Sequence, residues 1–351
     1  MKNTNFEKKI SFKNLYAFGN KLPIDLSLSE NPLGFSPKLR GFKWIKGINI
    51  KDYPDPKLTI LKKAISKRFN LDISNIFISS GSEGILKILP SAVMERNDEA
   101  IIPELTFLMF EIVARLNGNI VVFSRMTPKY DIDLDDIKRK INKKTKMIFI
   151  CNPNNPTGRV ISKQKLIKFV QSIKPIVVVD EANIEFGGES IIDQTQKNKN
   201  LIVLRTFSKG YGLAGLRIGF AIADIDIIKR LEEFSQPFPI NTLVEKAVII
   251  ALTDDKFLSK SKDLMNKERL FLTNSLRKRN FLVIDSDTNN VLVNVSHFNR
   301  KNNFIDRLNK EGVSVVRGSS FRGLNDNYIR ISPRLRKINQ LFINKIDLLL
   351  T

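Results

Sequence analysis

The sequence predicts an α/β protein in which helices sandwich a mostly parallel seven-stranded sheet, with a smaller α+β domain beside it. Two observations predict this class. Short runs of apolar and β-branched residues alternate with segments whose apolar residues recur at helical spacing, and the runs are almost continuously apolar. Strands that are buried on both faces are typical of a parallel sheet with helices on each side.

The predicted strands lie between residues 75 and 223. They are NIFISS (75–80), EAIIPE (99–104), NIVVFS (119–124), MIFICN (147–152), PIVVVD (175–180), LIVLRT (201–206) and RIGFAIA (217–223). The segment at 56–70 illustrates the helical spacing between them, because Leu58, Leu61, Ile65 and Phe69 share one face.

After residue 235 the pattern changes to longer helices, at 242–253 and about 256–279, followed by weaker strands and a closing helix at about 335–350. A chain of 351 residues exceeds the usual length of one domain. We therefore expect residues 1–45 to form an N-terminal arm and part of a small domain. Residues 46–240 form the large domain, and residues 241–351 form the small C-terminal domain.

The composition limits the possible partners and location. A single cysteine, Cys151, excludes an internal disulfide, and one cysteine with one histidine, His297, leaves no common zinc set, so no metal is expected. No apolar stretch is long enough for a signal peptide or a membrane span, which predicts a cytoplasmic protein without membrane contact.

The formal net charge is +22 and its densest basic stretch is KRKINKKTK, residues 138–146. Basic residues nevertheless occur in every segment and are mixed with Asp and Glu, and no basic strand carries interspersed aromatic residues. A nucleic acid is therefore unlikely as the main partner. An anionic small molecule would benefit from the same positive field.

Ligands of open parallel sheets bind at the carboxyl ends of the strands, so the residues after each run are candidates. Gly81, Ser82 and Glu83 open the helix after the first run and offer free amides to a phosphate, although a helix cap is the simpler interpretation. The loop CNPNNPTG after the fourth run directs Asn152, Asn154 and Asn155, or is a plain turn.

Two later segments indicate a specific chemistry. Asp180 ends a fully apolar strand, where a buried carboxylate requires a cation opposite it. In TFSKGYGLAGLR, Lys209 follows a strand end between hydroxyls, and Arg217 is expected to begin the next strand. A desolvated lysine suits Schiff-base chemistry, hydroxyls with an arginine suit a phosphate, and a carboxylate suits a protonated ring nitrogen. Carbonyl, phosphate and pyridinium on one molecule describe pyridoxal phosphate.

The ordered motifs resemble those of the fold-type I pyridoxal-phosphate-dependent aminotransferases of class I/II, and within them the histidinol-phosphate aminotransferase subfamily most closely. The resemblance spans almost the whole chain. Its motifs are SENPLGFSP (29–37), YPDP (53–56), GSEG (81–84), TFLMF (106–110), NPNNPTG (152–158), DEA (180–182), TFSKGYGLAGLR (206–217) and YIRIS (328–332).

The resemblance implies roles for individual residues. Lys209 forms the Schiff base with the cofactor and moves a proton between the substrate Cα and the cofactor C4′, while Asp180 keeps the ring nitrogen protonated. Asn155 binds the ring hydroxyl and Phe107 stacks on the ring. The phosphate ligands implied are Ser82, Glu83, Thr206, Ser208 and Arg217.

The resemblance also implies a homodimer in which Tyr53 reaches the cofactor phosphate of the neighbouring subunit. Arg330 matches the arginine that binds a substrate carboxylate or phosphate, and Asn31 and Arg322 are expected to line the same pocket. Asn183 stands where the family usually has a tyrosine that touches the ring oxygen. Its amide can still donate to that oxygen, so cofactor binding is expected to survive.

The implied reaction is transamination between histidinol phosphate and 2-oxoglutarate, which gives imidazole acetol phosphate and L-glutamate in histidine biosynthesis. Two alternatives keep the fold and the cofactor: a threonine-phosphate decarboxylase, and an aminotransferase for another amino acid or phosphorylated amine. A more distant alternative is a nucleic-acid-binding or regulatory protein that retains the pyridoxal phosphate pocket.

Overall fold

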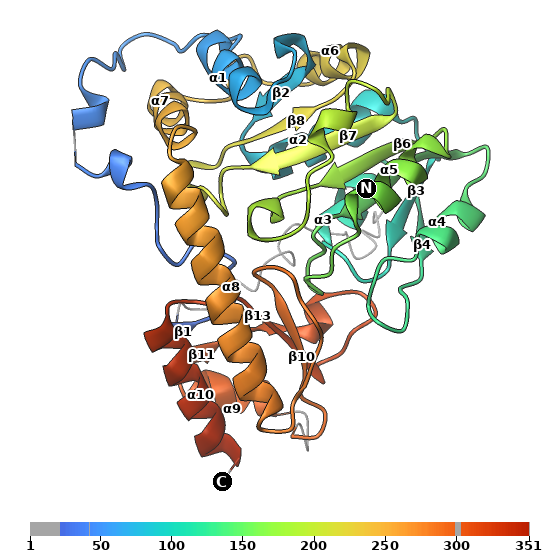
Figure 1. The fold of residues 1–351 in the computed structure, drawn as a ribbon. Helices are drawn as coiled ribbons and strands as arrows, with labels where there is room; N and C mark the ends of the chain where they lie inside the picture. The colour runs from blue at the N-terminus through green and yellow to red at the C-terminus, as the bar shows by residue number, and fades with distance from the viewer. Residues whose placement is uncertain (1–21, 42, 299–302, 351) are drawn as a thin grey trace, which may run out of the picture.

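The computed structural model describes residues 22–41, 43–298 and 303–350, and it shows a large and a small domain joined by one long helix (Figure 1). The first 21 residues of the predicted N-terminal arm lie outside the described residues. Within those residues, no helix combines the length and the apolar character that crossing a membrane requires.

The large domain is built on a seven-stranded sheet with the strand order β2-β8-β7-β6-β5-β3-β4. β8 is antiparallel to its neighbours β2 and β7, and the other pairs are parallel, which confirms the predicted fold class. The strands are β2 (Ile76–Ser79), β3 (Glu99–Pro103), β4 (Ile120–Ser124), β5 (Thr145–Cys151), β6 (Ile176–Asp180), β7 (Leu201–Thr206) and β8 (Gly219–Ile222).

Helices cover both faces of this sheet, and each face has its own apolar core. Val177 and Val179 of β6 point into one core and Val178 points into the other, which is why the strand is apolar at every position. The helices of the first face are α1 (Thr59–Phe69), α5 (Lys163–Gln171) and α7 (Thr242–Ala251). Those of the second are α2 (Gly81–Val93), α3 (Met109–Leu116) and α6 (Ile225–Glu233), while α4 (Leu134–Lys140) lies near β3 and β4.

The small domain packs a four-stranded antiparallel sheet, in the order β12-β13-β10-β9, against helices. A short strand of the N-terminal segment, β1 (Ile24–Asp25), pairs in parallel with β11 (Val313–Ser314), so this segment joins the small domain. The other elements are α8 (Asp255–Arg277), β9 (Leu282–Val283), β10 (Val291–Asn294), α9 (Phe304–Lys310), β12 (Val316–Arg317), β13 (Tyr328–Ile331) and α10 (Arg336–Leu350).

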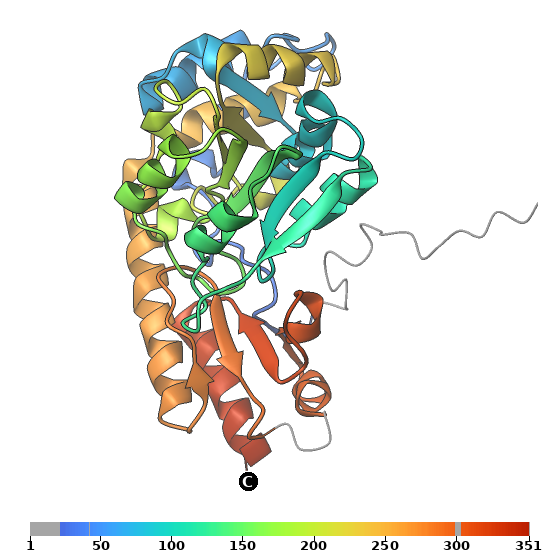
Figure 2. The ribbon, with the colours of Figure 1, turned by 90° about the vertical axis from the view of Figure 1, so that its right-hand side faces the viewer.

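Helix α7 corrects the domain boundary expected at residue 241. Val244 and Val248 pack in the large-domain core, whereas Leu272 and Leu276 of α8 pack in the small-domain core. The boundary therefore falls within α8, which runs along both domains on one side (Figure 2). The sequence shows where the helices lengthen, and that point precedes the change of packing partner.

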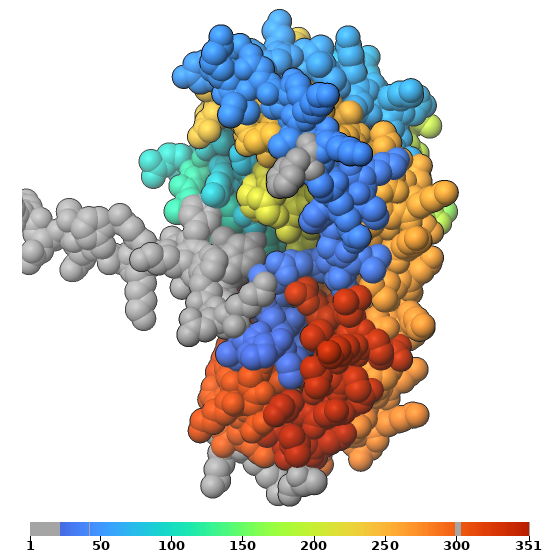
Figure 3. All heavy atoms as spheres, turned by 90° about the vertical axis from the view of Figure 1, so that its left-hand side faces the viewer, coloured from blue at the N-terminus to red at the C-terminus, as the bar shows by residue number. Residues whose placement is uncertain are grey.

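The chain crosses between the domains twice, once along residues 26–36 and once along α8. The two crossings are bonded to each other. The amide of Asn31 donates to the Ser261 hydroxyl over 2.9 Å, and the Ser36 hydroxyl donates to the Asp254 carboxylate. Figure 3 shows the N-terminal segment in blue, extending from the small domain to the large domain beside α8.

Candidate active site

The candidate residues gather where the parallel strands end. Asp180 is the last residue of β6 and Thr206 is the last residue of β7, and the two strands are direct neighbours. Helix α2 begins directly after β2, at the same edge of the sheet. The sheet thus brings together residues that lie more than one hundred positions apart in the sequence.

The N-terminus of α2 lies directly against the end of β8. Gly219 pairs with both Ser79 and Thr206, and a Cβ atom at this glycine would lie 2.5 Å from the Ser82 nitrogen. A side chain at position 219 would therefore push the first turn of α2 off the sheet. Free amides at a helix N-terminus favour an anion, and this glycine sets them beside the end of β7.

Arg217 completes an anion cradle at this helix end. Its guanidinium lies 3.5 Å from the Ser208 hydroxyl and 3.4 Å from the Glu83 carboxylate, and the Thr206 hydroxyl donates to Ser208 over 3.0 Å. Arg217 does not begin the strand as predicted. It ends a short 3-10 helix with a φ of +48°, and β8 begins two residues later, at Gly219. Two hydroxyls, a guanidinium and helix amides suit a phosphate.

Lys209 lies just beyond this cradle and is held in an unusual electrostatic environment. Burial and, to a smaller extent, the positive charges of Arg330 and Arg217 together lower the pKa of its amine to about 8. Since the neutral amine is the nucleophile, this environment favours attack on a carbonyl at neutral pH. The amine thus has the chemistry that Schiff-base formation requires.

Asp180 is 2% exposed, and one of its oxygens accepts a hydrogen bond of 3.0 Å from the Ala182 amide. Burial raises the pKa of its carboxyl to about 7, and the negative charges of Glu83 and Glu181 add to the effect. The Lys209 charge acts in the opposite direction. A cation held against Asp180 would lower this pKa and keep the carboxylate ionised, which fits a protonated ring nitrogen.

Arg330, on β13, is the second buried cation of the site. Its guanidinium is 7% exposed and burial lowers its pKa to about 10. It donates to neutral oxygens only. These acceptors are Ser29 Oγ at 3.3 Å, Asn155 Oδ1 at 3.3 Å, Asn290 Oδ1 at 3.2 Å and the carbonyl of Ser27. In the described part of the chain no carboxylate forms an ion pair with it, and its Nε has no hydrogen-bond partner. The charge of Asp25 acts on Arg330 without contacting it, and a buried guanidinium that no carboxylate contacts favours an anionic ligand.

The loop between β5 and α5 sorts its three asparagines into two kinds. Asn152 accepts from the Ile161 amide at 2.8 Å and Asn154 donates to the Leu105 carbonyl at 3.0 Å, so both hold the backbone in place. Only Asn155 turns its side-chain oxygen to Arg330. Its amide nitrogen therefore remains the group that can donate to a ligand beside Lys209.

Phe107 and Asn183 are the two residues expected to lie against the cofactor ring and its oxygen. Phe107 is partly buried and meets the edge of Phe110, with 5.8 Å between ring centroids. Asn183 is 5% exposed, and its side-chain oxygen has no hydrogen-bond partner. An orphaned buried amide oxygen is costly unless a ligand or water satisfies it.

Three predicted site residues lie elsewhere. Asn31 donates to the Gly210 carbonyl over 2.9 Å, so it holds the backbone that follows Lys209. Arg322 binds Glu111 through two contacts of 2.7 and 3.1 Å. The expectation that Asn31 and Arg322 line the substrate pocket stays a prediction, and in the structure the polar atoms of both residues bind protein groups. Tyr53 is 82% exposed and stacks on Phe238 on the outer surface.

The sequence missed the residues that surround Arg330. Asn290 binds both Arg330 and the Ser29 hydroxyl, and it reaches them because β10 pairs with β13. Gly158 makes this approach possible. A Cβ atom there would lie 2.0 Å from the Ser286 hydroxyl and 2.5 Å from the Asn290 carbonyl. A glycine after a proline-rich turn gives no sequence signal for such a contact between domains.

A desolvated lysine, a buried carboxylate on the next strand and an anion cradle at a helix end define an enzyme of the Schiff-base type. The chain belongs to the family described as "Aminotransferase class I and II", whose sequence profile matches residues 40–340.

Similar proteins agree with this assignment. The chain is 35% identical to the histidinol-phosphate aminotransferase of Clostridium novyi (strain NT) over 347 residues, 97% of this chain and 96% of that protein. The crystal structure of the histidinol-phosphate aminotransferase from Clostridium acetobutylicum matches with a TM-score of 0.84 and 29% identity, covering 92% and 97% of the two chains. The L-threonine-O-3-phosphate decarboxylase from Porphyromonas gingivalis matches with a TM-score of 0.75 and 25% identity, covering 85% and 93%.

Proposed function

We propose that the protein uses pyridoxal 5′-phosphate to transfer the amino group of histidinol phosphate to 2-oxoglutarate. The products are imidazole acetol phosphate and L-glutamate, which places the reaction in histidine biosynthesis. The buried guanidinium of Arg330 carries this proposal, because it contacts only neutral acceptors and both substrates bring an anionic group to it. The identity of 35% to a histidinol-phosphate aminotransferase over almost the whole chain supports the choice of substrate.

The residues fit the cofactor group by group. The cradle of Ser208, Thr206, Arg217 and the first turn of α2 binds the phosphate. Asp180 would hold the protonated ring nitrogen, and this ion pair would lower the pKa of its carboxyl from about 7, so that the carboxylate stays charged. When bound, pyridoxal phosphate supplies an electron sink for the bond that breaks at Cα.

Lys209 moves the proton. Its ε-amine, with a pKa of about 8, would take the proton from Cα of the amino donor and hold it for return to the product. Asn31 and Gly210 hold the backbone that follows this lysine, through a 2.9 Å hydrogen bond from the Asn31 amide. Arg330 would hold the anionic group of the donor, and this anchoring would fix the orientation of Cα relative to Lys209.

A second candidate function keeps the same site. The structural likeness to an L-threonine-O-3-phosphate decarboxylase spans 85% of the chain, so the fold does not separate the two reactions. In a decarboxylase, the carboxylate bond of the substrate would take the perpendicular position that the Cα proton takes in a transaminase. Arg330 would then hold the phosphate of phosphothreonine and leave its carboxylate free to depart.

Absorption spectroscopy tests both candidates. We expect the protein with bound pyridoxal phosphate to lose its visible band when histidinol phosphate is added, with a near-ultraviolet band of pyridoxamine phosphate in its place. Addition of 2-oxoglutarate should restore the visible band. An unchanged spectrum with histidinol phosphate, together with CO₂ release from phosphothreonine, would instead support the decarboxylase.

The proposal includes a cytoplasmic homodimer. The surface formed by the N-terminal segment and the start of α7 is rich in exposed apolar side chains: Phe35, Ile50, Tyr53, Phe238 and Leu243. A hollow of about 450 Å³ lies between Ile50, Tyr53 and Leu243. Exposed apolar surface of this kind is typical of an interface, and Tyr53 stands on it as a side chain that can reach a second subunit.

Light scattering tests the dimer, and Tyr53→Phe tests the reach of this residue. The Tyr53 hydroxyl would contribute one hydrogen bond to the cofactor phosphate, so its loss should weaken cofactor binding about tenfold. The variant should remain a dimer, since the ring stays in place. A monomeric wild-type protein with full activity would contradict this part of the proposal.

A further inference from the structure

The opposite edge of the large sheet carries a cluster of exposed lysines that the site does not use. The segments that lead into β5, β6 and β7, residues 141–146, 172–175 and 195–200, hold six lysines and no Asp or Glu. We call this cluster the amino-edge lysines. Its members are Lys143, Lys144, Lys146, Lys174, Lys197 and Lys199, and all six are exposed.

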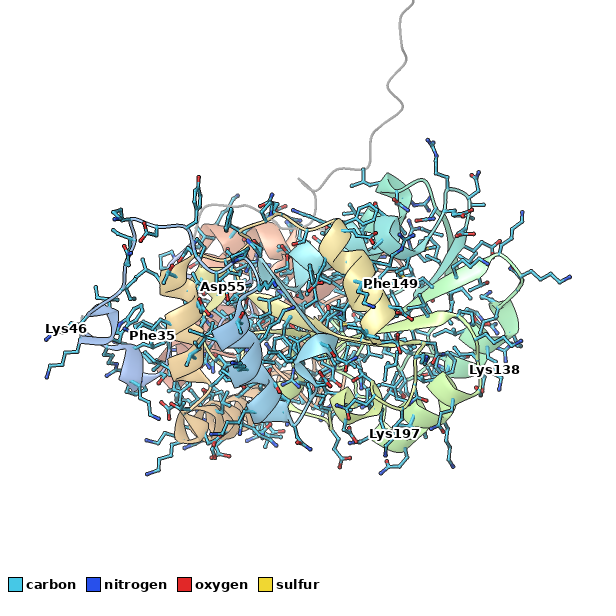
Figure 4. The ribbon with its side chains drawn as sticks, turned by 90° about the horizontal axis from the view of Figure 1, so that it is seen from above. Phe35, Lys46, Asp55, Lys138, Phe149 and Lys197 are labelled. Carbon is cyan, nitrogen blue, oxygen red and sulfur yellow. The ribbon has the colours of Figure 1, made fainter. Side chains whose placement is uncertain are left out.

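The sheet register brings these lysines together. Met147 of β5 pairs with Ile176 of β6, and Val177 pairs with Leu201 of β7. Because neighbouring strands lie about 4.8 Å apart, the starts of the three strands fall within about 10 Å. Figure 4 shows Lys138, close to this cluster in sequence, at the right and Lys197 along the lower edge right of centre, while Lys46 and Phe35 lie on the left.

These charges are not neutralised within the protein. Residues 138–200 are all described, and none of the six lysines forms an ion pair there. The acidic side chains nearest in sequence already have partners: Asp136 binds Arg139 at 3.1 Å and Asp193 binds Lys163 at 2.7 Å. One carboxylate, that of Glu99, lies beside Thr145 at this edge, so six lysines against one glutamate leave a local positive potential that attracts a polyanion.

The surroundings of the lysines favour a phosphate backbone over an acidic protein. None of the large hydrophobic side chains that are exposed in the described chain lies on β5, β6, β7 or the segments that lead into them. A stable protein interface needs buried aromatic or aliphatic anchors, whereas binding to a nucleic-acid backbone needs only cations and donors. The neighbours Asn142 and Gln196 are polar.

We propose that the amino-edge lysines form a sequence-independent binding surface for the phosphate backbone of nucleic acid. The surface lies at the amino ends of the strands and the active site at their carboxyl ends, so a bound strand leaves the substrate entrance open. This is a second activity beside transamination and does not depend on it. The recognition is purely electrostatic, because the six lysines provide charge without aromatic rings on which bases could stack.

The test measures binding of a fluorescein-labelled 20-nucleotide single-stranded RNA of mixed sequence to the full chain saturated with pyridoxal phosphate. We expect log K to fall linearly with log salt concentration, with a slope of about −4 if all six lysines contact phosphates. DNA of the same sequence should bind within about threefold of RNA, since phosphates rather than sugars or bases are contacted.

A matched pair of variants separates local from net charge. The edge variant changes Lys144, Lys174, Lys197 and Lys199 to Gln, and the control changes Lys256, Lys260, Lys262 and Lys267 of α8 to Gln. Both lower the formal charge from +22 by four, to +18. The edge variant should lose about 3 from the magnitude of the salt slope and more than tenfold in affinity at 0.1 M salt. The control should lose less than about threefold, and both should keep wild-type transaminase activity.

Three outcomes would overturn the proposal. One is a wild-type salt slope shallower than about −1, and another is an equal loss in the edge variant and the control, which would reduce the effect to net charge. The third is tighter binding of polyglutamate or of anionic lipid vesicles than of RNA at the same salt concentration. That result would assign the surface to an acidic protein or a membrane instead.

Discussion

The two edges of the seven-stranded sheet use the same kind of residue for opposite purposes. At the carboxyl edge, Lys209 is partly enclosed among other charges, and burial lowers its pKa to about 8. At the amino edge, Lys143, Lys144 and Lys174 are exposed and lie among polar residues. The difference shows that a lysine becomes a nucleophile near neutral pH only where the fold removes it from water, because desolvation lowers its pKa.

The comparison extends to the carboxylates. Asp180 at the carboxyl edge is buried with a raised pKa, whereas Asp193 binds Lys163 on the surface and its pKa is lowered. A buried carboxylate carries a charge that is costly without a partner, and a bound cation can lower this cost. An exposed carboxylate is already stabilised by water and surface cations. Substitutions at the two edges should therefore differ in size and in kind.

The largest effect should come from Lys209→Ala. Without the amine, neither the covalent link to the cofactor nor the proton transfer at Cα is possible, so kcat should fall on the order of 10³-fold or more. The matched change Lys174→Ala at the amino edge should leave kcat within about twofold. Stopped-flow and steady-state assays of both variants measure the contrast, and similar kcat values in the two would refute the assignment of Lys209.

Asp180→Asn sharpens the comparison through pH. In the cofactor-free protein, the folded-state pKa of Asp180 is about 7, above its unfolded value of about 4, so the folded state binds more protons between these pH values. The stability linked to this group is therefore fully present below pH 4 and is lost as the pH rises to 7. The loss amounts to about 4 kcal/mol, since each pKa unit corresponds to about 1.36 kcal/mol.

Asn cannot ionise, so the variant should lack this fall in stability. Urea unfolding of the cofactor-free wild type and variant at pH 4.5 and pH 7.5 measures it. Parallel stability curves for the two proteins would show that the Asp180 carboxyl titrates normally.

Arg330→Gln should have a smaller effect, on KM more than on kcat. One charge-assisted contact is worth about 1.5–3 kcal/mol, so KM for both substrates should rise about tenfold to hundredfold. Arg139→Gln, on the exposed helix α4, should leave KM unchanged. A rise in KM for one substrate alone would indicate that the other is bound by a different group.

The smallest effect should come from Lys143→Gln at the amino edge. An exposed lysine without an ion pair contributes little to folding, so the free energy of unfolding should stay within about 0.5 kcal/mol of the wild type. Thermal and urea unfolding check this value. A loss above 2 kcal/mol would mean that the amino edge is part of the folded core rather than a free surface.

The sequence predicted the large domain well because its strands are buried on both faces. Such strands are marked by continuous apolar runs, and the ends of β6 and β7 fall where the runs end. The prediction was less accurate at β8, because the positive φ of Arg217 delays the strand to Gly219. The motifs around Lys209 are short and local, and for that reason their positions were predictable.

The surroundings of Arg330 could not be predicted, because they depend on contacts between distant segments. Asn290 reaches Arg330 only through the pairing of Leu292 with Arg330 across β10 and β13. Arg322 was expected in the substrate pocket, and in the structure its guanidinium binds the carboxylate of Glu111 on α3. The amino-edge lysines were visible only in part, as the basic stretch 138–146, since the sheet adds Lys174 and Lys197 to them.

The two crossings between the domains limit how the domains can move relative to each other. Residues 26–36 and α8 are joined by the hydrogen bonds Asn31–Ser261 and Ser36–Asp254. The domains are therefore connected by two bonded segments rather than by a single flexible linker. Two bonded segments oppose twisting and sliding of one domain against the other more than they oppose a rotation about the line that the segments share. Away from these segments, the domains contact each other where Tyr130 and Tyr328 share a hydrogen bond of 2.8 Å and where Arg322 binds Glu111. Separating the domains would break these contacts together with the Arg330–Asn155 hydrogen bond and the packing of Gly158 against Asn290, while Asn31 holds the backbone that follows Lys209.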